Sequence, residues 1–213
     1  MLRQLETVIP PPPGKPDPIS EHPMRHVTRQ VAFERNGWTP ERAGKVEALF
    51  DDLASEWHTR GNPERRDAVH DALGRGGPFP GGTCLELGSG IGLFTETIRD
   101  AVAGTCSVVA VDLSLEMLRR APAGAAPRLQ ADASTLPFAN GAVATAVLVN
   151  MLLFPLEIDR VLRPDGVLVW VNTLGDATPI HLVAADVAEA LPGEWTGVHA
   201  DAGWGTWAAL RRA

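Results

Sequence analysis

Three closely spaced glycines stand out in the segment LELGSGIG, residues 85–92. A loop of this kind lets the backbone approach a ligand closely and adopt positive φ values. The spacing differs from the dinucleotide-binding pattern Gly-x-Gly-x-x-Gly, because Leu93 occupies the third glycine position and Gly92 comes one residue early. A tight strand-to-helix turn without a ligand would also use glycines, so the residues around the loop must decide its function.

Three acidic side chains are predicted to lie near this loop. Asp112 ends a predicted strand, where a carboxylate can accept both ribose hydroxyls, and Asp132 ends the next strand, where it can read an adenine amino group. Glu86 would repel a pyrophosphate but suits a positively charged ligand. A ribose, an adenine and a cationic tail without phosphate describe S-adenosylmethionine.

Residues 80–173 resemble a class I S-adenosylmethionine-dependent methyltransferase of the small-molecule type. The matching segments, in the family's order and separations, are ELGSGIG (86–92), VDLS (111–114), DASTLPF (132–138) and LRPDGVL (162–168). The segment FDDLASEW (50–57) resembles the lead-in helix of many small-molecule members. The resemblance implies methyl transfer from S-adenosylmethionine to a small-molecule acceptor.

The resemblance also implies a set of cofactor-binding residues. These are Glu86, Gly88, Ser89, Gly90, Gly92, Asp112, Leu113, Asp132, Ala133 and Asn150. The glycines would line the methionine portion of the cofactor, with Glu86 near its ammonium group. Asp112 would bind the ribose, and Leu113, Asp132 and Ala133 would hold the adenine. Asn150 would face the methyl group and the acceptor, although a strand-end cap explains this asparagine equally well.

Methyl transfer is an in-line displacement that depends mainly on holding the reactants in position. Where the acceptor must lose a proton, the candidate general bases are His58, His181 and His199. His58 ranks first because it follows Trp57 at the end of the helix expected to cover the cofactor; a solvated histidine is the alternative. Trp57 is predicted to be a lid over the sulfonium, or else it fills the seam between this helix and the sheet.

Two other functions stay open at this point. A nicotinamide-dependent oxidoreductase is disfavoured by Leu93 and Glu86. A non-catalytic protein could have kept the cofactor loop and lost its acceptor site.

The elements that position these residues alternate between strands and helices. Strands are predicted at 83–87, 106–111, 128–131, 143–149, 167–171, 195–200 and 206–210, and helices at 93–102, 114–120, 156–162 and 182–191. This alternation predicts an α/β fold with a Rossmann-like, doubly wound sheet. The resemblance implies seven mostly parallel strands in the order 3-2-1-4-5-7-6, with an antiparallel last strand.

The N-terminal region has a different composition. Residues 1–20 are predicted to be a Pro-rich extended tail, residues 21–78 a helical cap or lid, and residues 79–213 the methyltransferase domain. Thr39 is expected to cap a helix that ends near Gly61, and a second helix should begin at residues 62–64 and stop at Gly74.

The composition excludes several kinds of partner. A net charge of −7 disfavours nucleic acid, and Cys84 and Cys106 are expected to be reduced. No metal site is expected, because Pro23 argues against a helix that would align His22 with His26. The longest apolar run, 142–156, is shorter than the roughly 20 residues that span a bilayer. We therefore expect a cytoplasmic protein that binds no membrane.

Overall fold

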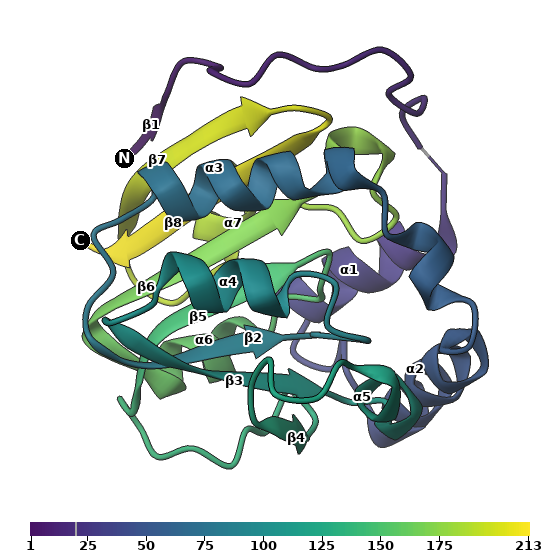
Figure 1. Ribbon diagram of the computed structural model, residues 1–213. Helices are drawn as coiled ribbons and strands as arrows, with labels where there is room; N and C mark the ends of the chain where they lie inside the picture. The colour runs from purple at the N-terminus through teal and green to yellow at the C-terminus, as the bar shows by residue number, and fades with distance from the viewer. Residues whose placement is uncertain (20) are drawn as a thin grey trace.

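The computed structural model describes residues 1–19 and 21–213. Within them, one eight-stranded sheet has the strand order β1-β7-β8-β6-β5-β2-β3-β4 (Figure 1). The strands are β1 (Leu2–Gln4), β2 (Gly82–Leu87), β3 (Cys106–Asp112), β4 (Arg128–Gln130), β5 (Val143–Val149), β6 (Leu162–Asn172), β7 (Trp195–Ala202) and β8 (Gly205–Arg212). Only β8 runs antiparallel to its neighbours. The predicted order of the seven strands from β2 to β8 is confirmed.

The eighth strand, β1, corrects the predicted strand number. Leu2 lies opposite Gly197 in a parallel pairing with β7, and Leu5 N–H donates to the backbone oxygen of His199 (2.8 Å). The prolines of the tail begin only at Pro10, so the first residues keep the N–H groups that a strand needs. A strand of three residues is too short to show an alternating pattern. Residue 20, the last of the predicted tail, lies outside the described residues.

Helices cover both faces of the sheet (Figure 1). One face carries α3 (Asp67–Arg75), α4 (Thr95–Ala101) and α5 (Leu115–Arg120), and the other carries α1 (Pro23–Phe33), α6 (Pro155–Val161) and α7 (Ala184–Ala190). The helix α2 (Pro40–Leu53) packs beside α5. Among the described residues, none of the helices combines the length and apolar character that crossing a bilayer requires.

The hydrophobic core has two parts, one on each side of the sheet. On β2, Leu85 and Leu87 point into the part that contains Ile158 of α6. Cys84 points the other way, into the part that contains Ile98 of α4. All residues of the central strand β5 are buried, as its continuous apolar sequence predicts. The sheet is thus a rigid base whose carboxyl ends can hold a site.

Helix α1 was not predicted, because Pro23 was read as a helix breaker. The structure places Pro23 in the first turn, where a proline loses no intrahelical hydrogen bond. His22 caps the helix, since its Nδ1 accepts a hydrogen bond from Met24 N–H (3.1 Å). The expectation that Pro23 argues against a helix at this point is therefore wrong.

Helix α2 starts as predicted, but its end and the bounds of the helix after it differ from the prediction. Thr39 Oγ1 accepts from Arg42 N–H (3.2 Å) and caps α2, which ends at Leu53 rather than near residue 61. Two short 3₁₀ helices follow, η1 (Trp57–Arg60) and η2 (Pro63–Arg66). Helix α3 continues past Gly74 to Arg75. These turns bring the segment back toward the carboxyl ends of the strands, where Trp57, Arg60 and Arg65 line a cavity.

Candidate active site

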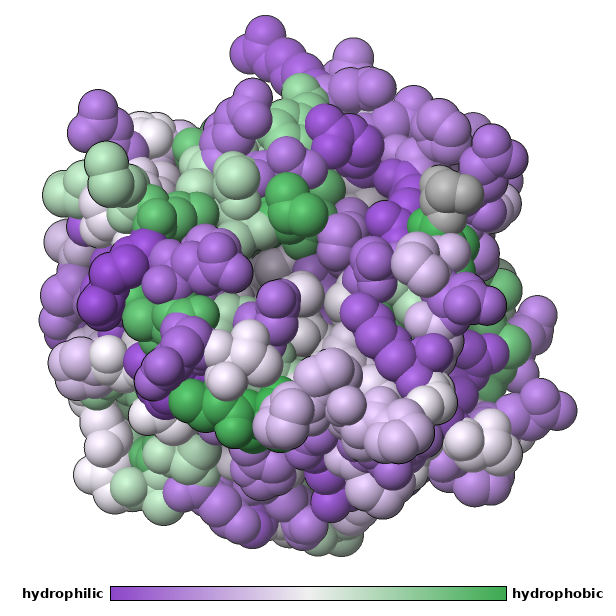
Figure 2. All heavy atoms as spheres, turned by 90° about the horizontal axis from the view of Figure 1, so that it is seen from above, coloured by the Kyte–Doolittle hydropathy of each residue, from purple (hydrophilic) through white to green (hydrophobic). Residues whose placement is uncertain are grey.

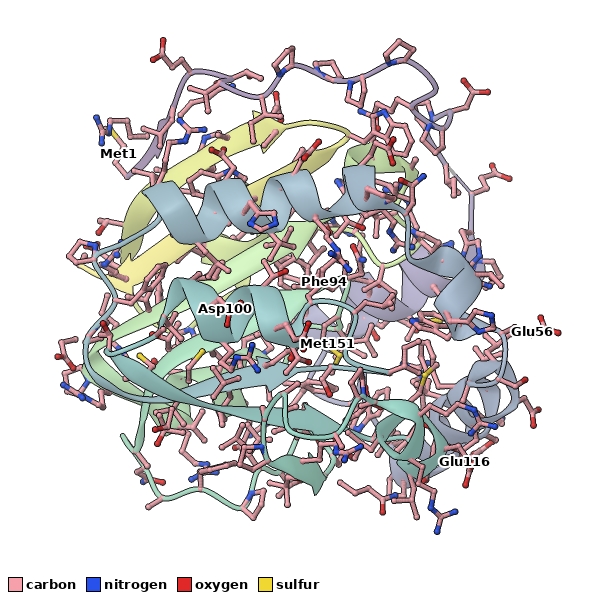
Figure 3. The ribbon with its side chains drawn as sticks, in the orientation of Figure 1. Met1, Glu56, Phe94, Asp100, Glu116 and Met151 are labelled. Atoms are coloured by element: carbon pink, nitrogen blue, oxygen red, sulfur yellow. The ribbon has the colours of Figure 1, made fainter. Side chains whose placement is uncertain are left out.

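A cavity of about 380 Å³ lies at the carboxyl ends of the strands. Its wall combines the glycine loop and the ends of β3, β4 and β5 with residues of α1, α2, η1 and η2. Phe94 and Met151, which are labelled in Figure 3, both line the cavity. The volume falls within the range of small-molecule sites, roughly 300–1,000 Å³.

The glycine loop forms one side of the wall through Gly88, Ser89 and Gly90. All three glycines have positive φ, with values of 71°, 57° and 78° for Gly88, Gly90 and Gly92. A Cβ added to Gly90 would lie 3.7 Å from Trp57 Nε1, an ordinary contact, so the space in front of this backbone is open. Ser89 is buried, and its Oγ has no hydrogen-bond partner in the described structure. The loop thus allows a ligand to approach its backbone closely, beside a buried hydroxyl group without a partner in the described structure.

Asp112 connects the end of β3 with the glycine loop. Its Oδ2 accepts a hydrogen bond from Gly90 N–H (2.7 Å), and its Oδ1 accepts from Ser114 N–H (2.8 Å). Burial raises the pKa of this carboxyl group, and the backbone hydrogen bonds oppose that shift. Each oxygen keeps a lone pair for a ligand hydroxyl. Asp112 and the following Leu113 both line the cavity.

Asp132 and Ala133 also line the cavity, at the end of β4. The Asp132 carboxylate accepts hydrogen bonds from Trp38 Nε1, at 2.9 and 3.2 Å to its two oxygens, and from Ser134 N–H (2.8 Å). The Trp38 ring packs edge-on against Phe154, with 5.2 Å between ring centroids. A ligand that contacts Asp132 would therefore share its carboxylate with Trp38.

Glu86 lies beneath the loop and is not part of the cavity wall. Its side chain is buried, and Thr95 Oγ1 donates a hydrogen bond of 2.5 Å to its carboxylate. Burial, with a smaller effect of the Asp112 charge, raises the pKa of Glu86 to about 8. Gly92 is also outside the wall; it forms the tight turn before α4, where an added Cβ would lie 3.3 Å from Thr95 Oγ1.

Asn150 follows β5 and lines the cavity with a positive φ of 51°. Its Nδ2 donates to Thr173 Oγ1 (2.9 Å), and Thr173 N–H donates to its Oδ1 (2.8 Å). The asparagine amide thus joins the ends of β5 and β6. Unusual backbone conformations of this kind cluster at functional sites, which is consistent with a role for Asn150. Its place beside the acceptor stays a prediction.

The structure does not bring the three candidate bases into the cavity wall. His58 is exposed, with Nδ1 3.1 Å from the backbone oxygen of Ser55. His181 lies 3.2 Å from Arg25 Nη1, and burial, followed by the charge of Arg25, lowers its pKa. His199 belongs to β7, away from this cavity. His22 does line the cavity. No local pattern in the sequence indicated that it caps a helix.

Trp57 lines the cavity close to the glycine loop. Phe50 packs edge-on against its ring with 5.4 Å between centroids, and the Arg60 guanidinium lies 4.7 Å from the ring centroid. Arg60 and Arg65, which both line the cavity, were not predicted as site residues. Their only signal in the sequence is two positive charges within a turn-rich segment.

Comparisons with known proteins agree with this geometry. Residues 85–170 match the methyltransferase domain family, and no curated protein sequence matches the chain. A S-adenosylmethionine-dependent methyltransferase from Aquifex aeolicus aligns over 81% of this chain and 98% of its own, with 16% identity and a TM-score of 0.58. A chain of the Haloferax volcanii complex that contains the Trm112 methyltransferase activator aligns over 57% of this chain and 59% of its own (24% identity, TM-score 0.49). Phosphoethanolamine N-methyltransferase 2 from Haemonchus contortus aligns over 46% and 26% (24% identity, TM-score 0.40).

The structural match to the Aquifex aeolicus protein shows that the fold is shared. The family match covers the glycine loop together with Asp112, Asp132 and Asn150. A nicotinamide-dependent oxidoreductase, the alternative open from the sequence, does not agree with this match. The chain therefore contains a class I S-adenosylmethionine-dependent methyltransferase domain.

Proposed function

We propose that the protein transfers a methyl group from S-adenosylmethionine to a small-molecule acceptor by in-line displacement within this cavity. The observation that carries the proposal is the composition of one continuous wall. Gly90 and Asp112 form the side that suits the cofactor, while Met24 and Ile180 contribute an apolar side for an acceptor. Both reactants would then share one enclosed space, as direct transfer requires.

The residues of the wall fit the cofactor in the following way. Asp112 would accept hydrogen bonds from the ribose hydroxyls, Ser89 Oγ would bond a polar group of the cofactor, and the Gly90 backbone would leave room for the methionine portion. Leu113, Asp132 and Ala133 would hold the adenine. When bound, S-adenosylmethionine supplies an electrophilic methyl group attached to a positively charged sulfur. Glu86, beneath the loop, positions the start of α4 through Thr95.

The protein's contribution to the reaction is orientation and exclusion of water. Aromatic side chains of the wall, among them Trp57 and Phe94, shield the reacting atoms. His22 accepts Met24 N–H at Nδ1, so its neutral ring carries a proton on Nε2 and serves as a hydrogen-bond donor to the acceptor. His58, which is exposed and outside the cavity wall, has no part in this scheme.

The same proposal assigns the three parts of the chain. Residues 21–78 act as the cap, supported by the contribution of Trp38, Phe50 and Trp57 to the cavity wall. Residues 79–213 form the methyltransferase domain. The tail, residues 1–20, braces the segment after β6, supported by the ion pair of Lys15 with Asp176 (3.2 Å). Seen from above, the face of the molecule carries hydrophobic residues in separate patches among hydrophilic ones (Figure 2).

The experiment is a transfer assay with S-adenosylmethionine that carries a tritiated methyl group. The purified protein is incubated with fractions of a metabolite extract, and label is followed into small molecules. We expect transfer by the unmodified protein and none by an Asp112→Ala variant that remains folded. Binding of S-adenosylhomocysteine without transfer to any fraction would instead favour a non-catalytic cofactor-binding protein.

A further inference from the structure

Two arginine side chains, Arg60 of η1 and Arg65 of η2, line the cavity. Arg65 is half-buried, and its Nε donates a hydrogen bond to Thr173 Oγ1 (3.0 Å), just beyond the end of β6. Arg65 Nη1 donates to the backbone oxygen of Arg60 (2.9 Å). Two positive charges are therefore held close together at one end of the cavity.

Within residues 1–19 and 21–213, neither guanidinium group forms an ion pair with an acidic side chain. Burial lowers the pKa of Arg65, and the neighbouring charge of Arg60 lowers it further. Glu56, four residues before Arg60, points outward from the molecule (Figure 3). A half-buried charge without a counterion is costly, so this arrangement fits a site that an anion completes.

The surrounding structure fixes both guanidinium groups in place. Thr173 is fully buried, and its Oγ1 also accepts a hydrogen bond from Asn150 Nδ2 (2.9 Å). Arg60 is held over the Trp57 ring. Arg65 uses Nε and Nη1 in these contacts, which leaves the N–H groups of Nη2 for a ligand. The planar guanidinium matches the geometry of carboxylates and phosphates.

Two sources of negative charge fit this position, the amino-acid carboxylate of the cofactor and an anionic group of the acceptor. Asp112 and Asp132 follow β3 and β4, and Thr173 follows β6. In the sheet, β2 and β5 lie between β3 and β6, so Thr173 is separated from the two aspartates. The segment after β6 also lines the cavity through Thr178 and Ile180, which belong to the acceptor side. Arg65, bonded to Thr173, thus lies on the side of the cavity that the acceptor would occupy. Arg60 lies between Arg65 and the glycine loop, because its guanidinium group rests on the Trp57 ring.

We propose that Arg60 and Arg65 bind an anionic group, a carboxylate or a phosphate, of the methyl acceptor. This inference rests on the proposed function and narrows its substrate class. The acceptor would combine an apolar body, packed against side chains such as Met24 and Ile180, with an anionic end held by the two arginines. The anion would fix the distance between the nucleophilic atom and the methyl group.

The experiment measures binding by calorimetry, first of the cofactor product and then of model anions. S-adenosylhomocysteine and 5′-methylthioadenosine, which lacks the amino-acid portion, are each titrated into the unmodified protein, Arg65→Gln and Arg66→Gln. Arg66 is exposed and outside the cavity wall, so Arg66→Gln is a control with the same charge change. Benzoate, its neutral analogue benzamide and inorganic phosphate are then titrated into each protein saturated with S-adenosylhomocysteine.

We expect benzoate or phosphate to bind the loaded protein, and benzamide to bind at least tenfold more weakly than benzoate. In Arg65→Gln, the affinity for the anion should fall at least tenfold. The affinity of Arg65→Gln for S-adenosylhomocysteine should stay within twofold. If Arg65→Gln does not fold, Arg60→Gln at an exposed position is expected to show the same pattern.

Two results would overturn the assignment. Loss of S-adenosylhomocysteine affinity in Arg65→Gln, with unchanged affinity for 5′-methylthioadenosine, would show that the arginines bind the cofactor carboxylate. No anion binding to the loaded protein would also reject the acceptor site while leaving the methyltransferase function intact. Failure of the unmodified protein to bind S-adenosylhomocysteine would instead contradict the proposed function itself.

Discussion

Gly90→Ala separates cofactor contact from backbone strain, because the chain offers a matched control. Gly90 has a φ of 57°, and Gly141 has a φ of 64°. A Cβ at Gly90 meets its nearest neighbour at 3.7 Å, and a Cβ at Gly141 meets nothing within 4 Å. Neither alanine is blocked by the protein, but only Gly90 faces the cavity.

The two variants should lose similar stability. A left-handed conformation costs a non-glycine residue roughly 1–2 kcal/mol, and each kcal/mol lowers the melting temperature of a domain of this size by about 2–4 °C. The methyl group of Gly90→Ala also occupies space that the cofactor needs. If overpacking costs about 1–3 kcal/mol, the affinity for S-adenosylhomocysteine should fall by about 5- to 150-fold.

Calorimetric titration with S-adenosylhomocysteine and a thermal melt of each variant provide the measurement. We expect melting temperatures that fall together and an affinity that falls only in Gly90→Ala. Equal cofactor affinity in folded Gly90→Ala and Gly141→Ala would refute the placement of the cofactor on the glycine loop.

Three further predictions follow from the same contacts. Asp112→Asn should weaken S-adenosylhomocysteine binding by roughly 1.5–3 kcal/mol, because an amide cannot replace both charged acceptor oxygens; unchanged calorimetric affinity would remove its ribose role. Glu86 keeps a proton in the folded state that the unfolded chain releases above its ordinary pKa of 4.5, so stability should fall as pH rises from about 4.5 to about 8. Urea unfolding should show a smaller decrease over that range in Glu86→Gln, and an equal decrease would contradict the burial argument. Trp57→Leu should reduce affinity for S-adenosylmethionine and S-adenosylhomocysteine equally, because Arg60 already lies over the indole ring; a larger loss for S-adenosylmethionine would show that the ring contacts the sulfonium.

Local spacing in the sequence was enough to predict the seven strands from β2 to β8 and the glycine loop, and the family resemblance implied the order of those strands. The turn after β2 has positive φ at Gly88, Gly90 and Gly92. Glycine adopts this conformation most readily, so the turn can be recognised from its glycines in the sequence. Strand ends in a parallel sheet meet at one edge, so Asp112 and Asp132 could be placed there from their positions after apolar runs. These inferences use neighbours within a few residues of one another.

The acceptor side depends on contacts between residues far apart in the chain. Trp38 bonds Asp132 across 94 positions, and Arg65 bonds Thr173 across 108. Side chains in turns and 3₁₀ helices carry no periodic signal, so the direction in which Arg65 points is set only when its side chain bonds Thr173, just beyond β6. Pairing of β1 with the free edge of β7 is likewise a long-range event. The sequence by itself therefore determined seven of the eight strands and the glycine loop, because these depend on local spacing, whereas only tertiary packing decided which charges and rings complete the cavity.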